Sequence, residues 1–440
     1  MTQDAAVSFA ALWESLLPIG RDGHSGGYRR FSWTPEDAAC RAWFTQAAAE
    51  RDLRVLTDRN GNLWAWWDPP APVGSSASPG SPGSPGPVGP PGPPGGAGVP
   101  VGAKAVVTGS HLDSVPDGGA FDGPLGIVSS FAAVDMLRER GHVPVRPLGI
   151  AAFSEEEGAR FGVACLGSRL LAGAIDPGTA RALPDAAGIT LAEAMAAAGH
   201  DPQDIGPDDD LLAAVGAYVE LHVEQGRALA DLDAAIGIGE QIWPHGRWRL
   251  DFAGRPDHAG TATLADRRDP MLPFAAAALA ARQAAASCGA LATIGRVIAE
   301  PGAVNAVSAR VSAWLDARAP DERVLRSVVD QVLTAAREAA ASHQVELRAG
   351  PESVTPAVGF DPGLRERLAS SLAARGIRAP VLPTGAGHDA GVLAARIPAA
   401  MLFVRNPTGV SHSPAEHAEP ADCASGVLAL AAVLEDLACR

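Results

Sequence analysis

Two apolar runs separated by a helix constrain the fold of this chain most strongly. The segment AVVTGSHLDSV (105–115) is apolar and runs into polar residues, and VRPLGIAAFSEEEG (145–158) repeats that pattern. The residues between them, 124–139, have the character of a helix. Parallel strands buried on both faces read as continuous apolar runs, and they need a crossover connection between them. The sequence therefore predicts an α/β fold with a mostly parallel sheet, whose ligands lie outside the carboxyl ends of the strands.

Residues of the kinds that bind metal ions end both runs. His111 and Asp113 end the first run, Asp122 follows in a turn rich in small residues, and the glutamates 155–157 end the second run. A hydrolase site with two metal ions needs a bridging carboxylate and about three ligands for each ion. These residue types at strand ends predict such a site.

Three later segments supply the imidazoles that would complete it. His222 lies in ELHVEQG, His388 in GAGHDA and His412 in SHSP. A single histidine between apolar residues is more often a buried structural residue, so only the combination supports a metal site. The glutamates 155–157 have an alternative as a solvated surface cluster. However, they end an apolar strand, where burial and like charges would raise the pKa of one member and favour a general base.

The stretch 232–350 differs from the rest of the chain. Its pattern predicts strand, helix, two strands, helix and strand, which is the ferredoxin-like βαββαβ unit. The segments 1–231 and 351–440 share the α/β character. We therefore predict a metal-binding catalytic domain formed by 1–231 and 351–440, with 232–350 inserted as a smaller domain.

Residues 69–102 consist almost entirely of Pro, Gly, Ser, Val and Ala. From Gly80 the glycines fall on every third position, which is the period of collagen. Because the segment is short and of low complexity between two predicted strands, we expect a disordered loop without a catalytic role.

Composition excludes several classes of partner. The formal net charge of -15 argues against nucleic acid or an anionic membrane surface. Five scattered cysteines without a CxxC pair are typical of reduced thiols in the cytoplasm. No apolar stretch approaches the ~20 residues that cross a bilayer, and the N-terminus does not read as a signal peptide. We therefore expect a soluble cytoplasmic protein that acts on a small molecule.

Taken together, these segments resemble the M20-type metallopeptidase superfamily, and within it the amidase/carbamoylase branch. That branch contains N-carbamoyl-L-amino acid hydrolases, allantoate amidohydrolases, ureidoglycolate amidohydrolases and β-ureidopropionases. The matching phrases stand in the family order, and they are TGSHLDSVPDGGAFDGPLG, FSEEEGARFG, ELHVEQG, DHAGTAT, VNAVSARVSAWLDAR, PTGAGHDA and GVSHSPAE.

The resemblance implies two divalent metal ions. One would be held by His111, Asp122 and His222, and the other by Asp122, Glu156 and His412. Zinc or manganese suits this mixed nitrogen and oxygen ligand set, and cobalt or nickel would also fit.

The resemblance also implies roles for residues around the ions. Glu155 would be the general base, with Glu157 as the alternative if the register is shifted by one, and Asp113 would orient His111. His258 would be catalytic and would reach the active site of the partner subunit in a homodimer, with 232–350 as a lid and dimerisation domain. Five residues would contact or shape the substrate site: Gln225, Asn305, Arg318, Gly387 and His388.

The implied reaction is hydrolysis of a C–N bond of a ureido or carbamoyl group on a small carboxylate, with release of ammonia and carbon dioxide. Arg405 and Asn406 would lie near the site and could hold a second ureido or anionic group, which favours allantoate. N-carbamoyl-L-amino acids and short N-acyl amino acids are the alternatives. A dipeptidase or aminoacylase fits less well, because related peptidases tend to carry a carboxylate where this chain has His222. A non-catalytic binding protein fits poorly, because every implied ligand is present.

Overall fold

The computed structural model describes residues 3–70 and 104–439. Most of the predicted Pro/Gly loop, residues 71–102, therefore lies outside the described residues. The chain forms two compact units. The first contains Met1–Glu240, Phe360–Leu382 and Gly387–Arg440, and the second contains Gln241–Gly359 and Pro383–Ala386.

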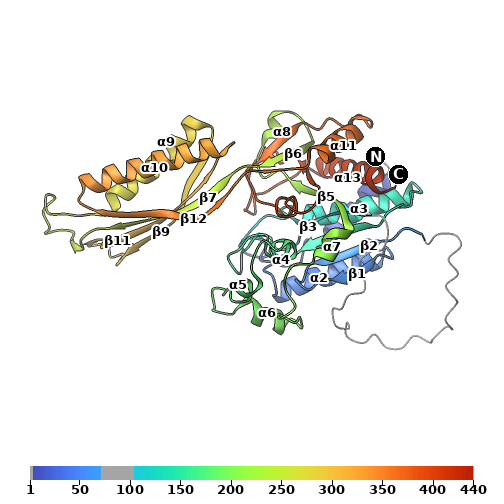
Figure 1. The fold of residues 1–440 in the computed structure, drawn as a ribbon, viewed down its shortest axis with the longest axis horizontal. Helices are drawn as coiled ribbons and strands as arrows, with labels where there is room; N and C mark the ends of the chain where they lie inside the picture. Colours follow the sequence, from blue (N-terminus) through green and yellow to red (C-terminus); the bar gives the residue numbers. More distant parts are fainter. Residues whose placement is uncertain (1–2, 71–103, 440) are drawn as a thin grey trace. The chain divides into compact units, whose positions relative to one another are not determined.

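A mixed sheet with a parallel centre organises the first unit (Figure 1). Strands β3, β4 and β15 are buried at every residue, as expected for strands covered on both faces. The pairs β3–β4, β3–β5 and β5–β15 are parallel, which confirms the predicted α/β architecture. In spatial order the strands are β1 (Arg54–Thr57), β2 (Leu63–Trp67), β4 (Leu148–Phe153), β3 (Ala105–His111), β5 (Val215–Val223), β15 (Ala399–Val404) and β6 (Ile236–Ile242).

The crossover helix α3 (Pro124–Glu139) connects β3 to β4 and occupies the residues predicted from the sequence. Pro124 stands in its first turn, where a missing N–H costs nothing. The helix is buried along most of its length and packs against α1 and α13. The other helices of this unit are α1 (Gln3–Leu16), α2 (Pro35–Ala49), α4 (Leu166–Ala172), α5 (Pro177–Arg181), α6 (Leu191–Ala197), α7 (Asp209–Ala214), α8 (Ala228–Asp231), α11 (Pro362–Ala373), α12 (Asp389–Leu393) and α13 (Pro420–Ala438).

The strand register brings the polar strand ends together at one edge of the sheet. His111 at the end of β3 is paired with Phe153 at the end of β4, directly before the glutamates 155–157. On the other side, His222 of β5 is paired with Phe403 of β15. Because these strands are parallel, all of their carboxyl ends meet at the same edge.

The second unit is a four-stranded antiparallel sheet in the order β12-β7-β11-β9, with the predicted βαββαβ sequence of elements. Helices α9 and α10 cover one face of the sheet (Figure 1). On β7 the buried Trp248, Leu250 and Phe252 alternate with more exposed residues, as in a sheet with one covered face. The elements are β7 (His245–Ala253), α9 (Met271–Cys288), β9 (Leu291–Glu300), β11 (Arg310–Arg318), α10 (Glu322–Ser342) and β12 (Glu346–Thr355), with a separate pair formed by β8 (Asp257–His258) and β10 (Ala306–Val307).

The unit boundaries differ from those predicted at 232 and 350. β6 pairs with β15 up to Ile238, so the chain leaves the first unit only after Glu240. Position 350 lies inside β12, and the chain returns to the first unit at Phe360. The short strands β13 (Val358–Gly359) and β14 (Val381–Thr384) pair with β6.

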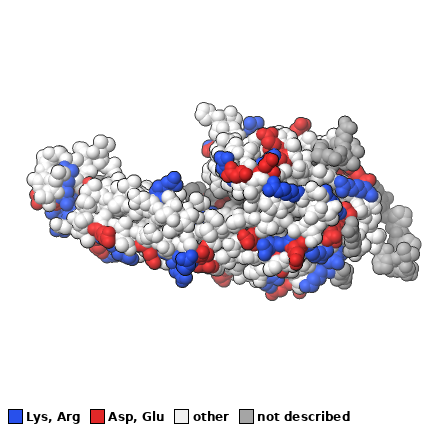
Figure 2. All heavy atoms as spheres, turned by 90° about the horizontal axis from the view of Figure 1, so that it is seen from above, with Lys and Arg blue, Asp and Glu red and all other residues white. Residues whose placement is uncertain are grey.

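Within the described ranges, no helix is long and apolar enough to cross a membrane. On the face drawn in Figure 2, basic and acidic side chains are interspersed rather than gathered into a basic stripe.

Candidate metal centre

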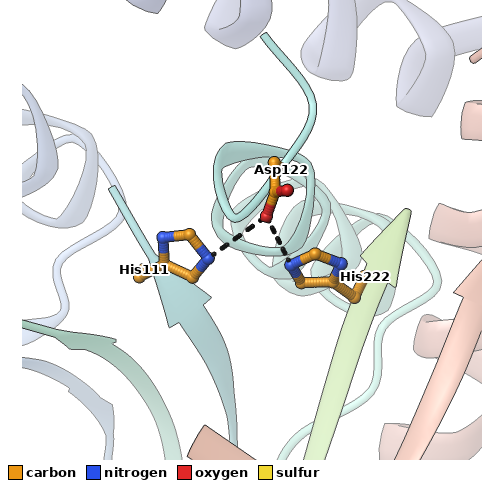
Figure 3. Close-up of side chains that lie close together, drawn as sticks. All are labelled: His111, Asp122 and His222. Atoms are coloured by element: carbon orange, nitrogen blue, oxygen red, sulfur yellow. Dashed lines mark ion pairs between the residues drawn. The ribbon is translucent and has the colours of Figure 1, made fainter. Parts of the chain in front are cut away.

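Two histidines and a carboxylate converge at the carboxyl edge of the sheet. His111 ends β3, His222 lies near the end of β5, and Asp122 comes from the loop that leads into α3. Figure 3 shows Asp122 between the two imidazole rings. Its Oδ1 atom lies 3.6 Å from His111 Nε2 and 3.2 Å from His222 Nε2. All three side chains are buried.

The orientation of both rings fits a metal ion. His111 Nδ1 lies 3.1 Å from the carbonyl oxygen of Asp113, and His222 Nδ1 lies 2.9 Å from that of Val223. A ring nitrogen that faces a carbonyl must donate its proton, so in a neutral ring the lone pair is on Nε2. Both Nε2 atoms are buried without a hydrogen-bond partner in the described structure. A divalent cation between them and Asp122 would satisfy all three side chains.

A second group of ligands shares Asp122. His412 Nε2 lies 3.4 Å from Asp122 Oδ2 and 3.5 Å from Glu157 Oε2. Asp122 therefore offers one oxygen to His111 and His222 and its other oxygen to His412. This is the arrangement of a carboxylate that bridges two metal ions.

The three consecutive glutamates face three different environments. Glu157 joins Asp122 and His412. Glu156 points its Oε2 atom at His111 Nε2, 3.6 Å away, and its Oε1 atom accepts a hydrogen bond from the Cys165 thiol.

Glu155 is turned away from the ligand groups. Its Oε1 atom accepts the backbone N–H groups of Arg160 and Phe161, at 2.9 and 2.7 Å, so it organises the following loop. The structure thus departs from the predicted assignment, which made Glu155 the base and Glu156 the ligand. The physical reason is the left-handed backbone at Glu155, with φ of 54°, which determines where the next two side chains point.

Asp113 holds this arrangement in place. Its two carboxylate oxygens accept the backbone N–H groups of Glu156 and Glu157, at 3.2 and 3.1 Å. Its carboxylate lies 3.5 Å from His111 Nδ1, whereas its own carbonyl is nearer to that atom. The backbone carbonyl of Asp113 is thus the nearer partner of His111, and orientation of His111 by the Asp113 carboxylate remains a prediction. The carboxylate itself holds the backbone of two of the glutamates.

Several carboxyl groups crowd together at the centre. Burial and the charge of Asp122 raise the pKa of Glu157 to about 8. Burial alone would also raise the pKa of Asp122, but the imidazoles of His111 and His222 outweigh it and lower that pKa well below its ordinary value. Carboxylates crowded in this way are what a divalent cation would neutralise.

Three of the predicted substrate residues lie in the first unit. Gln225 donates from Nε2 to Asp122 Oδ2 at 2.7 Å, and its Oε1 atom is buried without a partner in the described structure. The His388 ring is buried against the edge of the His222 ring, with centroids 4.6 Å apart. Burial and the nearby His222 lower the pKa of His388 well below its ordinary value, so it stays neutral. Gly387 precedes it, and open space lies where a Cβ would be.

The other predicted residues lie in the second unit. His258 on β8 is paired with Ala306 on β10, next to Asn305, whose carbonyl accepts the N–H of Ala259. His258 Nδ1 accepts the N–H of Gly260, so its Nε2 carries the donor proton in the neutral ring. These contacts bring His258 and Asn305 together.

Arg318 lies at the end of β11 in the four-stranded sheet. It forms an ion pair with Asp316 at 2.9 Å and donates to the carbonyl oxygen of Gly385 at 2.6 Å. Contacts of His258, Asn305 and Arg318 with a substrate at the metal centre remain predictions.

Arg405 and Asn406, expected near the substrate, make their described contacts within the protein. Arg405 forms two hydrogen bonds to the buried Asp422, at 2.7 and 2.9 Å. Asn406 is fully buried and uses its amide within the loop, on Thr408 and Val410. Asn406 thus organises the loop that precedes His412, whereas Arg405 pairs with the start of α13. Because both side chains make these contacts within the protein, they give allantoate no particular support.

Sequence reasoning missed two residues that contact the centre. Glu416 accepts the N–H of Asp122 at 2.9 Å, and the Ser411 hydroxyl lies 3.1 Å from Asp122 Oδ2. Both residues lie close to His412 in the sequence, and this proximity is the one feature of the sequence that could have pointed to them. The contact of Glu416 with Asp122 spans 294 positions, so the spacing within the motif could not reveal it.

A largely parallel α/β sheet with two histidine–carboxylate groups at its carboxyl edge defines a metal-dependent hydrolase. Residues 107–436 match Peptidase family M20/M25/M40, and the chain belongs to this family. The predicted resemblance is thereby confirmed, and the chain is a hydrolase of the M20 amidohydrolase type. Members of this family bind divalent metal ions, and the ligand groups described above fit them.

Several characterised relatives match nearly the whole chain. An N-carbamoyl-L-amino acid amidohydrolase of Geobacillus stearothermophilus is 34% identical and aligns over 94% of this chain and 95% of the relative. The allantoate amidohydrolase of Escherichia coli K12 is 29% identical, with 96% of each chain covered.

Solved structures agree with these relatives. AtUAH in complex with (S)-hydroxyglycine has a TM-score of 0.80 at 28% identity, covering 98% of this chain and 97% of its own. A hydantoinase/carbamoylase family amidase from Burkholderia ambifaria has a TM-score of 0.77 at 32% identity, covering 97% and 96%.

Proposed function

We propose that this protein hydrolyses a C–N bond of a ureido or carbamoyl group on a small carboxylate and releases ammonia. The observation that carries the proposal is Asp122, which offers one oxygen to His111 and His222 and the other to His412. Relatives named for N-carbamoyl-L-amino acids, allantoate and ureidoglycolate support the substrate class.

N-carbamoyl-L-amino acids are the first candidate substrates. The relative named for them is 34% identical to this chain, and Arg405 and Asn406, which had favoured allantoate, are used within the protein. Allantoate is the second candidate, supported by the relative that is 29% identical.

Two divalent ions would complete the site. His111, Asp122 and His222 would hold one, and Asp122, Glu157 and His412 the other. Zinc or manganese suits these ligands, as would cobalt or nickel. When bound, the ions would polarise the substrate carbonyl and lower the pKa of a water molecule.

Glu156 is the proposed general base, in place of Glu155. It lies beside His111 without belonging to either ligand group, with Oε2 3.6 Å from His111 Nε2. The Cys165 thiol donates to its Oε1 atom, which leaves Oε2 to accept a proton from water. Burial raises the pKa of Glu156 well above its ordinary value, and the nearby charges of Asp389 and Glu157 add to this. A base with a raised pKa can take the proton and return it to the leaving nitrogen.

The second unit would supply substrate contacts. The Nε2–H group of His258 would donate to the carbonyl oxygen as negative charge develops there, from the partner subunit of a homodimer. Arg318 and Asn305 would bind the substrate carboxylate, and closure of this unit as a lid would exclude water. Gln225, Gly387 and His388 would line the pocket around the reacting group. We expect the homodimer in the cytoplasm.

The test measures ammonia release by the metal-reconstituted protein and, in parallel, release of the free amino acid, because N-formyl amino acids and dipeptides yield no ammonia when they are cleaved. The panel contains N-carbamoyl-L-amino acids with their D-enantiomers as controls, allantoate, ureidoglycolate, N-formyl-L-amino acids and dipeptides. Release from an N-carbamoyl-L-amino acid at the highest kcat/KM supports the first candidate, and release from allantoate the second. Cleavage of dipeptides or formyl amides alone contradicts the proposed substrate class.

A further inference from the structure

Glu416 is a buried carboxylate that contacts the backbone on which Asp122 stands. Its side chain is 5% exposed, and its Oε1 atom accepts the N–H groups of Phe121 and Asp122, at 3.0 and 2.9 Å. A Cβ at Gly119 would collide with this carboxylate, so the loop needs glycine where Glu416 approaches it. Glu416 therefore holds the main chain of the bridging residue.

The other oxygen of Glu416 reaches the loop that carries His412. Oε2 accepts the Ser411 hydroxyl at 3.0 Å, and that hydroxyl also lies 3.1 Å from Asp122 Oδ2. One side chain thus links the backbone of Asp122 to the residue directly before His412. These contacts connect two loops that are far apart in the sequence.

His412 needs such support more than the other two histidines. Its side chain is 51% exposed, whereas those of His111 and His222 are 1% exposed. Carbonyl oxygens hold the Nδ1 atoms of His111 and His222, but among the described contacts His412 Nδ1 has no hydrogen bond. His412 also has a left-handed backbone, with φ of 54°, a conformation that such residues keep only when their surroundings impose it.

We propose that Glu416 is a positioning residue that assembles the second metal group, made of Asp122, Glu157 and His412. It does so by fixing the backbone of Asp122 and the His412 loop relative to each other. This inference rests on the metal centre proposed above, but not on the identity of the substrate. Loss of a side chain that orients metal ligands typically lowers metal affinity by about 10- to 100-fold. We expect a loss of this size for the second ion and a smaller one for the ion at His111 and His222.

The experiment measures metal binding rather than turnover. Metal-free full-length protein is titrated with Co²⁺, whose visible absorption reports the ligand geometry, and each affinity is obtained by competition with a chelator. The variants are Glu416→Ala, Glu416→Gln and Ser411→Ala. Asp422→Asn is the matched control, because it breaks a buried ion pair with Arg405 in the same unit without touching the metal ligands. Urea unfolding of each metal-free variant measures stability separately.

The proposal predicts that Glu416→Ala lowers the affinity for the second Co²⁺ ion by about 10- to 100-fold and changes the absorption spectrum of that ion. Glu416→Gln should recover most of the affinity, because its carbonyl oxygen can still accept both N–H groups. Asp422→Asn should lose stability and keep both affinities.

Three results would overturn the proposal. The first is wild-type affinity for both ions in Glu416→Ala. The second is an equal loss of affinity in Glu416→Ala and Asp422→Asn, which would show a general effect of stability. The third applies if Glu416→Ala does not fold. Ser411→Ala is then the decisive variant, because it removes the link to the His412 loop but keeps the hydrogen bonds of Glu416 to the N–H groups of Phe121 and Asp122. Unchanged affinity of Ser411→Ala for the second ion would contradict the proposed role. A wild-type protein that binds fewer than two ions would contradict the metal centre itself, whatever the substrate assay shows.

Discussion

Replacing the three glutamates one at a time separates the roles that we propose for them. Glu156→Gln removes the proposed base but keeps the size of the side chain and an oxygen that can accept the Cys165 thiol. A positioned general base contributes about 10²- to 10⁴-fold to rate, or about 3–5 kcal/mol of activation free energy. We therefore expect kcat to fall by that factor while metal content stays at the wild-type level.

Glu155→Gln should behave differently. The glutamine oxygen can still accept the N–H groups of Arg160 and Phe161, although without the negative charge that strengthens these two bonds. We expect the free energy of unfolding to fall by about 1–2 kcal/mol and kcat to stay within about tenfold of wild type. Glu157→Gln should lower the affinity for one of the two ions.

The assay combines kcat for ammonia release at saturating substrate with metal content and urea unfolding. The decisive comparison is Glu156→Gln against Glu155→Gln in the same buffer and with the same metal. If Glu155→Gln abolished turnover while Glu156→Gln remained active, the roles inferred from the contacts would be wrong and the register predicted from the sequence would be right.

Three further predictions address the metal centre and the substrate carboxylate. In the metal-free protein the pKa of Glu157 is raised from 4.5 to about 8 by burial and by Asp122. Between those values the folded state keeps a proton that the unfolded state has lost, so the free energy of unfolding should fall as pH rises through this window. Saturating Zn²⁺ should remove this fall. Urea unfolding at several pH values, with and without Zn²⁺, measures the profile, and a flat or rising profile in the metal-free protein would contradict the prediction. Gly123→Ala should weaken metal binding and lower the free energy of unfolding by about 1–3 kcal/mol, because φ is +85° there and the new Cβ would lie 2.5 Å from His111 Nδ1. Unchanged metal affinity in chelator competition would contradict this prediction. Arg318→Ala should raise KM by about 10- to 100-fold with less effect on kcat, because that change corresponds to the loss of one charged hydrogen bond to the substrate carboxylate. Arg247→Ala, which removes another partner of Asp316, is its control, and an equal rise in KM in both variants would point to an ordinary ion pair.

Much of the fold could be predicted because its signals are local. Strands β3 and β4 are continuous apolar runs, and the helix between them begins at Pro124 and covers the predicted residues. In the second unit, the two helices and four strands follow from period and order in the same way. The unit boundaries were harder to predict from the sequence, since only the pairing of β6 with β15 shows that β6 still belongs to the first sheet.

The identity of several candidate ligands was also predictable, for a related reason. His111 and His222 lie at or near the ends of buried parallel strands, and parallel pairing brings such ends to one edge whatever the loops do. Asp122 follows His111 closely enough that the turn before α3 returns it to the same edge. The sequence alone therefore determined the sheet, the edge at which the chemistry lies and the residue types gathered there.

The tertiary structure decided which of several equivalent residues lies where each proposed role requires it. Glu155, Glu156 and Glu157 are chemically identical, and their roles differ because a left-handed backbone at Glu155 and the N–H bonds to Asp113 aim the side chains in different directions. Glu416 reaches Asp122 only through the packing of two distant loops. These assignments depend on backbone rotation and long-range contact, and neither quantity is encoded in the spacing of residues along the chain.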